Sequence, residues 1–171
     1  MESLQYLLNH PCVVVSKVSA QLYEYYTPAG YSRLRSRASG RHRFQEQEAQ
    51  ALIKLFAKIA TQVGKLAAKF EKAANADKSK KEISPLLILH HDMLNMKPLL
   101  SKAAQKNNSS YYKLYDVLRS KSTQSDEAIA AVIEELNLFA AEISQKVEQA
   151  KTEAKTYPFG YGRGSKSHIL A

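Results

Sequence analysis

The chain has 171 residues, of which 44% are hydrophobic, and it carries a formal net charge of +9. This length fits one domain with a sizeable core, and the apolar fraction argues against a chain that is disordered throughout. The charge favours anionic partners: nucleic acid, acidic lipid headgroups or an acidic protein. Cys12 is the only cysteine, which excludes a disulfide within the chain and is typical of a reducing compartment such as the cytoplasm. No apolar run approaches the ~18 residues that a membrane span needs.

Two short helices are predicted near the start of the chain, over residues 3–9 and 11–26. Asn9, His10 and Pro11 mark the end of the first and the start of the second, because proline is favoured at the first position of a helix. Apolar side chains share one face of the second helix: Val14, Val18, Leu22 and Tyr25.

Residues 27–43 interrupt the helical pattern. The segment holds Pro28, Gly30 and Gly40 and no acidic residue. Its positive charges come from five arginines: Arg33, Arg35, Arg37, Arg41 and Arg43. We interpret it as an Arg-rich connecting loop that forms a flexible basic arm. Because a guanidinium group pairs with phosphate oxygens in a bidentate manner, these arginines are the predicted anion-binding residues.

Residues 44–76 predict the first of two long helices. Its apolar side chains recur at alternating steps of four and three, as in a heptad repeat: Leu52, Phe56, Ile59, Val63, Leu66, Phe70 and Ala73. A helix of this length cannot expose such a stripe to water, so other helices must cover it. A polar loop and two further helices follow, over residues 85–106 and 110–121, and Pro98 is expected to kink the first of these.

The second long helix is predicted over residues 125–156 and shows the same alternation: Ile129, Ile133, Leu136, Ala140, Ile143, Val147, Ala150 and Ala154. It is acidic, whereas the segment 44–81 is basic, so we expect the two long helices to be antiparallel neighbours. The predicted fold class is all-α: a four- or five-helix bundle with two long antiparallel heptad helices and flexible basic arms.

This bundle would form one domain, over residues 1–156, followed by a C-terminal tail over residues 157–171. The glycines of the tail exclude a continuous helix, and we interpret it as a flexible arm. Phe159 and Tyr161 in the tail, together with Tyr31, are predicted to stack on nucleic-acid bases, and Arg163 adds one more anion-binding side chain.

One compact cluster contains residue types used in catalysis, His90-His91-Asp92. With Met93 and the later Lys97-Pro98-Leu99, it resembles the phosphoacceptor box of sensor histidine kinases, which implies phosphotransfer at His91. The proline comes two residues later than in that family, which turns it by roughly 200° around the helix. The sequence offers no ATP-binding glycine motif and no zinc or di-iron ligand spacing. We therefore predict no catalytic residue, metal site, cofactor or enzymatic activity, and phosphotransfer at His91 stays an alternative.

The end of the chain resembles the C-terminal signals of effectors exported by bacterial type IV secretion systems. The residues that carry this resemblance are Glu148 and Glu153, then Ser165 to Ser167, then Ile169. It implies a protein that is translocated into a host cell and acts there, as the alternative to a cytoplasmic one.

The leading hypothesis is a non-enzymatic interaction module that binds an anionic partner through the Arg-rich loop. The partner is nucleic acid or a phosphoinositide membrane surface, although Leu34 is the only residue in the loop with an aliphatic side chain suited to membrane insertion. The other hypothesis is a protein–protein adaptor or secreted effector whose apolar helix faces dock a host protein, a partner helix or a second copy of the chain.

Overall fold

The computed structural model describes residues 1–10, 13, 15–23, 26–74 and 126–160. Within these ranges the chain forms helices and no strand: α1 (Glu2–Asn9), α2 (Val15–Leu22), α3 (Pro28–Ala38), α4 (Glu46–Ala74) and α8 (Asp126–Ala154). The all-α prediction is therefore confirmed for the part of the chain that the structure describes. The helices predicted over residues 85–106 and 110–121, with the kink at Pro98, lie outside the described residues.

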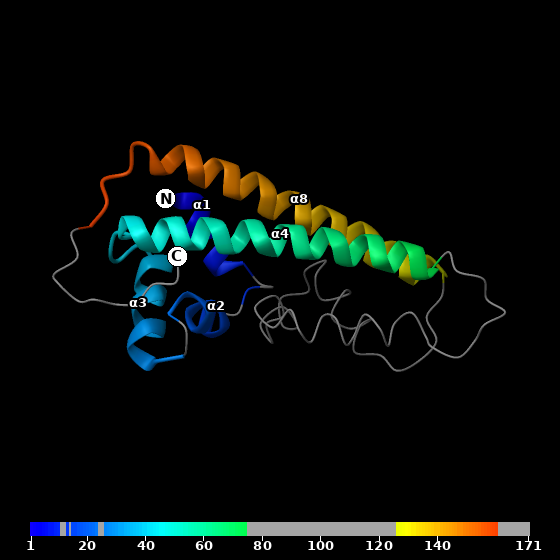
Figure 1. Cartoon of the computed structure of the whole chain (residues 1–171), viewed down its shortest axis with the longest axis horizontal. Coiled ribbons are helices and arrows are strands. Elements are labelled where there is room, and N and C mark those ends of the chain that lie inside the picture. Colours follow the sequence, from blue (N-terminus) through cyan, green and yellow to red (C-terminus); the bar gives the residue numbers. More distant parts are fainter. Residues whose placement is uncertain (11–12, 14, 24–25, 75–125, 161–171) are drawn as a thin grey trace.

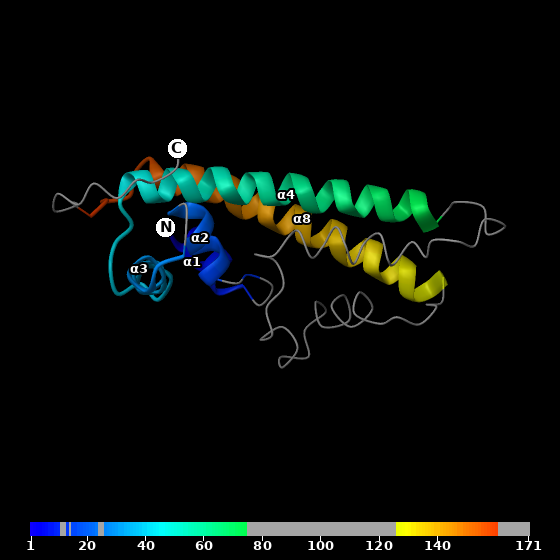
Figure 2. The same ribbon diagram turned by 60° about the horizontal axis from the view of Figure 1, so that its bottom comes forward.

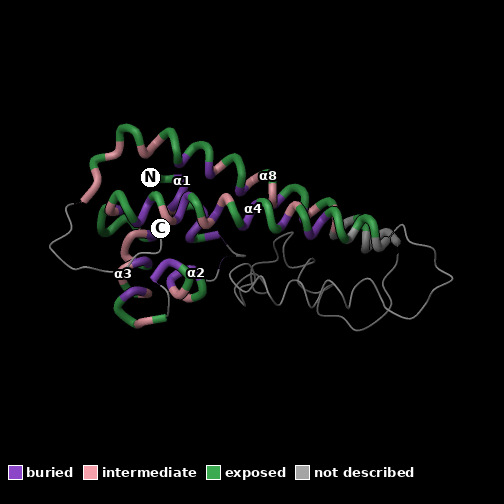
Figure 3. Tube along the Cα trace, in the orientation of Figure 1, coloured by how far each residue is buried: buried purple, intermediate pink, exposed green. Residues whose placement is uncertain are grey.

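The two longest helices, α4 and α8, have 29 residues each and lie side by side (Figures 1 and 2). The chain runs along α8 in the direction opposite to α4, as the colours of Figure 1 show. Both helices bury one side, and the buried segments recur along each in Figure 3. The buried side chains of α4 include Leu52, Phe56, Ile59, Val63 and Leu66, and those of α8 include Leu136, Phe139, Ile143, Val147 and Ala150. These are positions of the two predicted stripes, with Phe139 added.

The three short helices gather around the first half of α4 (Figure 1). α1 packs against α8, α3 and α4, and α2 packs against α3 and α4. Leu4, Leu7 and Leu8 of α1 and Val18 and Leu22 of α2 join the same core as the long helices. A single apolar core therefore holds all five helices together.

The prediction of an open loop over residues 27–43 is wrong, because residues 28–38 form α3. The Thr27 side chain accepts a hydrogen bond from the Gly30 N–H at 2.9 Å, and Pro28 follows at the first helical position. At the other end Gly40 has φ +74, and its N–H donates to the Arg37 carbonyl at 3.0 Å. Proline and glycine thus mark the two ends of a helix here.

The burial pattern of α3 explains why the apolar pattern of the sequence did not predict this helix. α3 buries only Gly30, Leu34 and Ala38, one residue every four, so its apolar side consists mostly of small residues. A Cβ added to Gly30 would lie 2.8 Å from Cδ2 of Tyr23 and 2.9 Å from Oγ1 of Thr27. Glycine is required at this position because α2 and α3 approach each other closely.

α2 is shorter than the helix predicted over residues 11–26. It begins at Val15 and ends at Leu22, and the Tyr23 N–H makes a last hydrogen bond to the Ser19 carbonyl at 3.0 Å. The chain needs this earlier end because α3 begins only a few residues later and packs back against α2. The predicted start at Pro11 lies outside the described residues.

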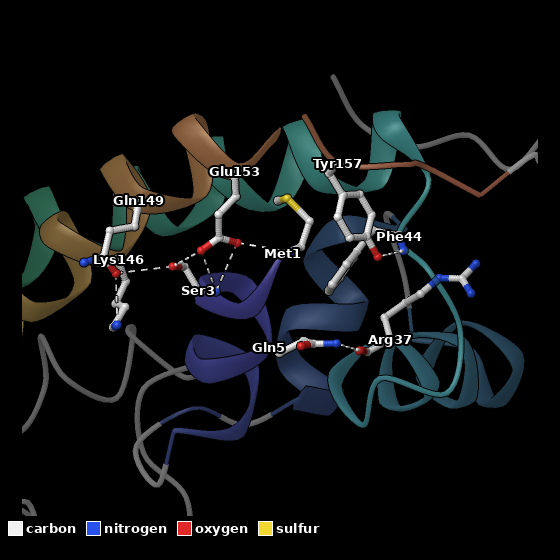
Figure 4. A network of polar contacts seen from close by, with 9 residues as sticks. All are labelled: Met1, Ser3, Gln5, Arg37, Phe44, Lys146, Gln149, Glu153 and Tyr157. Atoms are coloured by element: carbon white, nitrogen blue, oxygen red, sulfur yellow. Dashed lines mark hydrogen bonds and ion pairs between the residues drawn. The ribbon is translucent and has the colours of Figure 1, made fainter. Parts of the chain in front are cut away.

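A network of hydrogen bonds joins α1 to α8 (Figure 4). The Ser3 hydroxyl donates to Glu153 Oε1 at 2.6 Å, and the Ser3 N–H donates to the same carboxylate at 3.2 Å. The Met1 nitrogen lies 3.3 Å from Glu153 Oε2. Ser3 is in the first turn of α1, where backbone N–H groups have no partner within the helix. The carboxylate of Glu153 therefore caps α1 from a different helix.

The first residues of the predicted tail are packed against the protein rather than extended as a free arm. Tyr157 and Phe159 are partly buried against the core. The Gly160 N–H donates to the Phe44 carbonyl at 3.0 Å. Figure 4 shows the second bond, in which the Phe44 N–H donates to the Tyr157 hydroxyl at 3.3 Å. The prediction of a flexible tail is thus wrong for residues 157–160, and residues 161–171 lie outside the described part.

Candidate anion-binding site

The structure separates the five predicted arginines into two groups. Arg35, Arg41 and Arg43 are exposed. Arg33 and Arg37 are half-buried and contact other helices or their connections. Arg35 lies in the last turn of α3, and the other two exposed arginines follow it in the connection to α4. The candidate site therefore comprises Arg35, Arg41 and Arg43, which we call the arginine cluster.

Arg37 is engaged by Glu48, a fully buried carboxylate in the first turn of α4. Arg37 Nε donates to Glu48 Oε2 at 3.1 Å, with 12% of the Arg37 side chain exposed. Glu48 accepts two further hydrogen bonds, from the Tyr23 hydroxyl at 3.0 Å and from the Gln45 N–H at 3.2 Å. One carboxylate thus joins α3, the end of α2 and the start of α4. We assign Arg37 to the structure of the protein, because an uncompensated buried Glu48 would be costly.

Tyr23 is held in the same junction from both sides. Burial, followed by the charge of Glu48 and the hydrogen bond to it, raises the pKa of the Tyr23 hydroxyl well above its usual range. The guanidinium carbon of Arg33 lies 5.8 Å from the centroid of the Tyr23 ring, a cation–π distance. Arg33 is therefore oriented along Tyr23 instead of pointing freely into solvent.

Sequence reasoning missed Glu48, although a local signal existed. α4 begins at Glu46, so Gln45 is the residue just before the helix and Glu48 is the third residue of the helix. A glutamate at this third position commonly reaches back to the N–H of the residue that precedes the helix, as in a capping box. What the spacing could not reveal is that the same carboxylate also receives Arg37 and Tyr23 from the preceding helices.

The packed start of the tail passes beside the arginine cluster. A Cβ added to Gly160 would lie 3.5 Å from the Arg43 carbonyl oxygen and 3.6 Å from the Arg43 Cβ. Arg163 itself lies outside the described residues. The end of the described chain is thus held beside Arg43.

Two of the three residues predicted to stack on bases lie in the described part of the chain, and both are partly buried. Tyr31 is half-buried against the core, with its ring centroid 6.2 Å from that of Tyr26. Phe159 is partly buried and meets the Tyr157 ring edge-on, at a centroid distance of 5.1 Å. Tyr161 lies outside the described residues. The packing of Tyr31 and Phe159 occupies part of the surface that a base would need.

A second group of titratable side chains lies between α1 and α8. The Tyr6 hydroxyl donates to Glu142, whose other carboxylate oxygen lies 3.6 Å from His10 Nε2. The His10 ring stacks on Phe139 at a centroid distance of 4.9 Å. Burial lowers the pKa of His10, and Glu142 opposes this only in part. The hydrogen bond to Glu142, followed by burial, raises the pKa of Tyr6. This arrangement fixes α1 on α8, and its histidine is 95% enclosed by the protein.

The alternative sites from the sequence find no counterpart in the described part of the chain. His90 and His91, with the resemblance to a phosphoacceptor box, lie outside it. Among the residues described, no group of three or more His, Cys, Asp or Glu side chains is arranged to hold a metal ion. None of the described helices combines the length and hydropathy of a membrane span.

Comparisons with known proteins found no match for this chain. No protein-family model, no curated protein and no solved structure matches the chain. The charges, contacts and exposure of the chain's own residues therefore carry the functional proposal.

Proposed function

We propose that this chain is a non-enzymatic interaction module that binds nucleic acid through the arginine cluster. The observation that carries the proposal is the exposure of Arg35, Arg41 and Arg43 in and just after the last turn of α3, with the packed tail residue Gly160 beside Arg43. The guanidinium group is suited to bidentate pairing with phosphate oxygens. Arg163, tethered three residues beyond Gly160, would add a fourth contact to the same partner.

The burial of Leu34 favours nucleic acid over a membrane surface. Leu34 is the one leucine of the Arg-rich segment, and it is completely buried in the core. A peripheral membrane site gains much of its affinity from apolar side chains that enter the lipid beside the basic residues. Phosphate contacts to a nucleic-acid backbone need no such anchor.

The long helices would serve as the rigid support of this site. We propose that α4 and α8 form the antiparallel heptad pair of a helical bundle, which the remaining segments of the chain complete. Burial of every third or fourth residue on each helix supports this arrangement. Glu48 would then hold α3 against the start of α4 and fix the direction in which Arg35 points.

The test is binding of a mixed-sequence oligonucleotide to the wild-type chain and to the variant Arg35→Ser/Arg41→Ser/Arg43→Ser, measured by fluorescence anisotropy across a salt series. We expect the variant to lose most of its affinity, and the slope of log affinity against log salt to become shallower by about 2 to 3. Each lost phosphate contact removes the release of about one counterion, which sets this number.

A control with the same change in charge separates the site from a general effect of basicity. Lys17, Lys151 and Lys155 are exposed on α2, on α8 and just after α8. Their joint replacement by Gln should leave the affinity within about twofold, because none of them belongs to the arginine cluster. An arginine variant that binds as well as this control would overturn the proposal. Equal binding of phosphoinositide vesicles by the wild-type chain, abolished in the arginine variant, would instead assign the cluster to a membrane.

A further inference from the structure

The solvent face of α4 carries a line of lysines that continues away from the arginine cluster. We call these residues the lysine stripe: Lys54, Lys58, Lys65 and Lys72. All four are exposed, and no ion pair to a described residue engages them. Lys69 is exposed on the same side of the helix. The stripe is therefore a strongly charged surface that the stability of the helix does not itself require.

The spacing of the stripe places its charges in a straight row. At 100° per residue, Lys54, Lys58, Lys65 and Lys72 fall within about 40° of one another around the helix. The first and last are 18 positions apart, which corresponds to about 27 Å along the axis at 1.5 Å per residue. The face opposite them is the buried one, with Phe56, Val63 and their neighbours. The row is therefore held on a rigid rod.

The acidic residues of α4 are kept off this row. Glu48 is buried, and Glu46 and Glu71 are exposed about a quarter turn away from the lysines. Apart from Lys69, the other residues near the row are uncharged, among them Gln47, Gln50 and Thr61. A solvated helix face normally mixes both signs of charge, since opposite charges four positions apart stabilise the helix. Here lysines recur at steps of four and seven positions, and no acidic residue stands in the row, which points to an external anion as their partner.

We propose that the lysine stripe and the arginine cluster together form one surface for double-stranded nucleic acid. This inference rests on the proposed function and specifies its partner. A rod of about 27 Å with charges along one side matches most of a turn of B-form duplex, which is about 34 Å. Lysine acts as a point charge and reads no base, so binding is independent of sequence.

The chemistry of the face also selects duplex over single strand. Proteins that bind single strands combine basic residues with aromatic side chains on which successive bases stack. The exposed face of α4 has no aromatic residue among its described side chains, and Tyr31 and Phe159 are partly buried elsewhere. In the proposed surface, a stiff duplex bound at the arginine cluster also runs along the lysine stripe, whereas a flexible strand can bind the cluster alone.

The experiment compares four chains, which are the wild type, the arginine variant, a stripe variant and a control. Each is measured on two probes, a 20-base-pair DNA duplex and an unstructured single strand of the same length. The stripe variant is Lys54→Gln/Lys58→Gln/Lys65→Gln, and the control is Lys17→Gln/Lys151→Gln/Lys155→Gln, which changes the net charge equally. Glutamine keeps the helix propensity of lysine, and circular dichroism verifies that α4 is retained. We expect the stripe variant to bind the duplex about tenfold more weakly at moderate salt, with a salt slope shallower by about 2 to 3.

On the single strand the same variant should lose no more than about threefold, and the control should match the wild-type chain on both probes. Duplex binding by the stripe variant that equals the control would overturn the inference. Equal losses on duplex and single strand would also overturn it, since the stripe would then be a general anion surface. If the arginine variant binds both probes like the wild-type chain, the proposed function fails instead. A wild-type chain that binds neither probe refutes both.

Discussion

Glu48 and Glu153 have the same structural role at two different places in the protein. Each carboxylate satisfies backbone N–H groups at the start of a helix and accepts a hydrogen bond from a side chain of another helix. They differ in burial: the Glu48 side chain is completely buried, whereas 29% of the Glu153 side chain is exposed. Burial decides how much a carboxylate matters, because water can replace lost partners only where it has access.

The largest effect is expected from removing the buried carboxylate. Glu48→Ala leaves the Arg37 guanidinium and the Tyr23 hydroxyl in a nearly water-free junction without their acceptor. We expect a loss of about 3 to 5 kcal/mol in the free energy of unfolding, measured by urea denaturation. Glu46→Ala, two residues earlier and exposed, is the matched control and should cost less than about 1 kcal/mol. Similar losses for the two variants would show that burial does not determine the cost of removing a carboxylate here.

A smaller loss is expected at the partly exposed carboxylate. Glu153→Gln weakens the hydrogen bonds from Ser3 and the contact with the Met1 nitrogen, but solvent reaches the site. We expect a loss of about 1 to 2 kcal/mol, with faster amide exchange in α1 as the local readout. Glu148→Gln, on the exposed side of α8, should change stability by less than about 0.5 kcal/mol. A Glu153 variant as unstable as Glu48→Ala would contradict the role given to burial.

The pH dependence of Glu153 goes in the direction set by its partners. Burial alone would raise its pKa, but the hydrogen bonds from Ser3 and Met1 outweigh burial and lower the pKa. The unfolded chain therefore binds more protons in acid, and the contribution of Glu153 is lost as the pH falls through the lowered pKa. Urea denaturation of wild type and Glu153→Gln should converge in stability at low pH. A difference that is constant across the acid range would contradict this.

His10 adds a dependence at higher pH, in the same contact between α1 and α8. Its pKa is lowered by burial, so the folded protein binds fewer protons than the unfolded chain below about pH 6.5. Stability is thus complete above that pH and decreases as the pH falls below it. His10→Gln should flatten the stability profile between neutral pH and pH 5. A wild-type protein that gains stability as the pH falls over this range would show that Glu142 outweighs burial.

The smallest effect is expected at a buried hydroxyl that has no partner. Ser19 Oγ makes no hydrogen bond, and its residue is fully buried where α2 meets α3. Ser19→Ala removes a polar group that the fold does not satisfy, so the free energy of unfolding should stay within about 0.5 kcal/mol or increase. A loss above about 1 kcal/mol would indicate that the hydroxyl is satisfied in solution. The result calibrates the two carboxylates against a buried polar group without partners.

Among the described helices, the sequence predicted those whose apolar residues are large and regularly spaced. Leu52, Phe56 and Ile59 on α4, like Leu136 and Ile143 on α8, repeat at heptad spacing, and all are buried. α3 was missed because its buried side consists mostly of small residues, with Leu34 as the only large one. Its proline and glycine were interpreted as breaks, although they cap the helix.

For the candidate site, the sequence predicted which arginines are present but not which of them are exposed. The five arginines were visible in the sequence, but the division into exposed and engaged side chains depends on helices that meet in space. Arg37 is withdrawn from the site because Glu48, 11 positions later, lies against it. The tail residue Gly160 reaches Phe44 across more than a hundred positions. Contacts of this kind arise when helices pack in space, and they cannot be predicted from the spacing of residues along the sequence.

The most direct test of the central claim is the salt dependence of duplex binding by the wild-type chain. The arginine cluster and the lysine stripe together offer seven exposed side chains for phosphate contacts. With about 0.9 counterions released per contact, we expect log affinity to fall with log salt at a slope between about −3 and −6. A slope near zero, or no binding at low salt, would contradict the claim that these charges form a surface for nucleic acid.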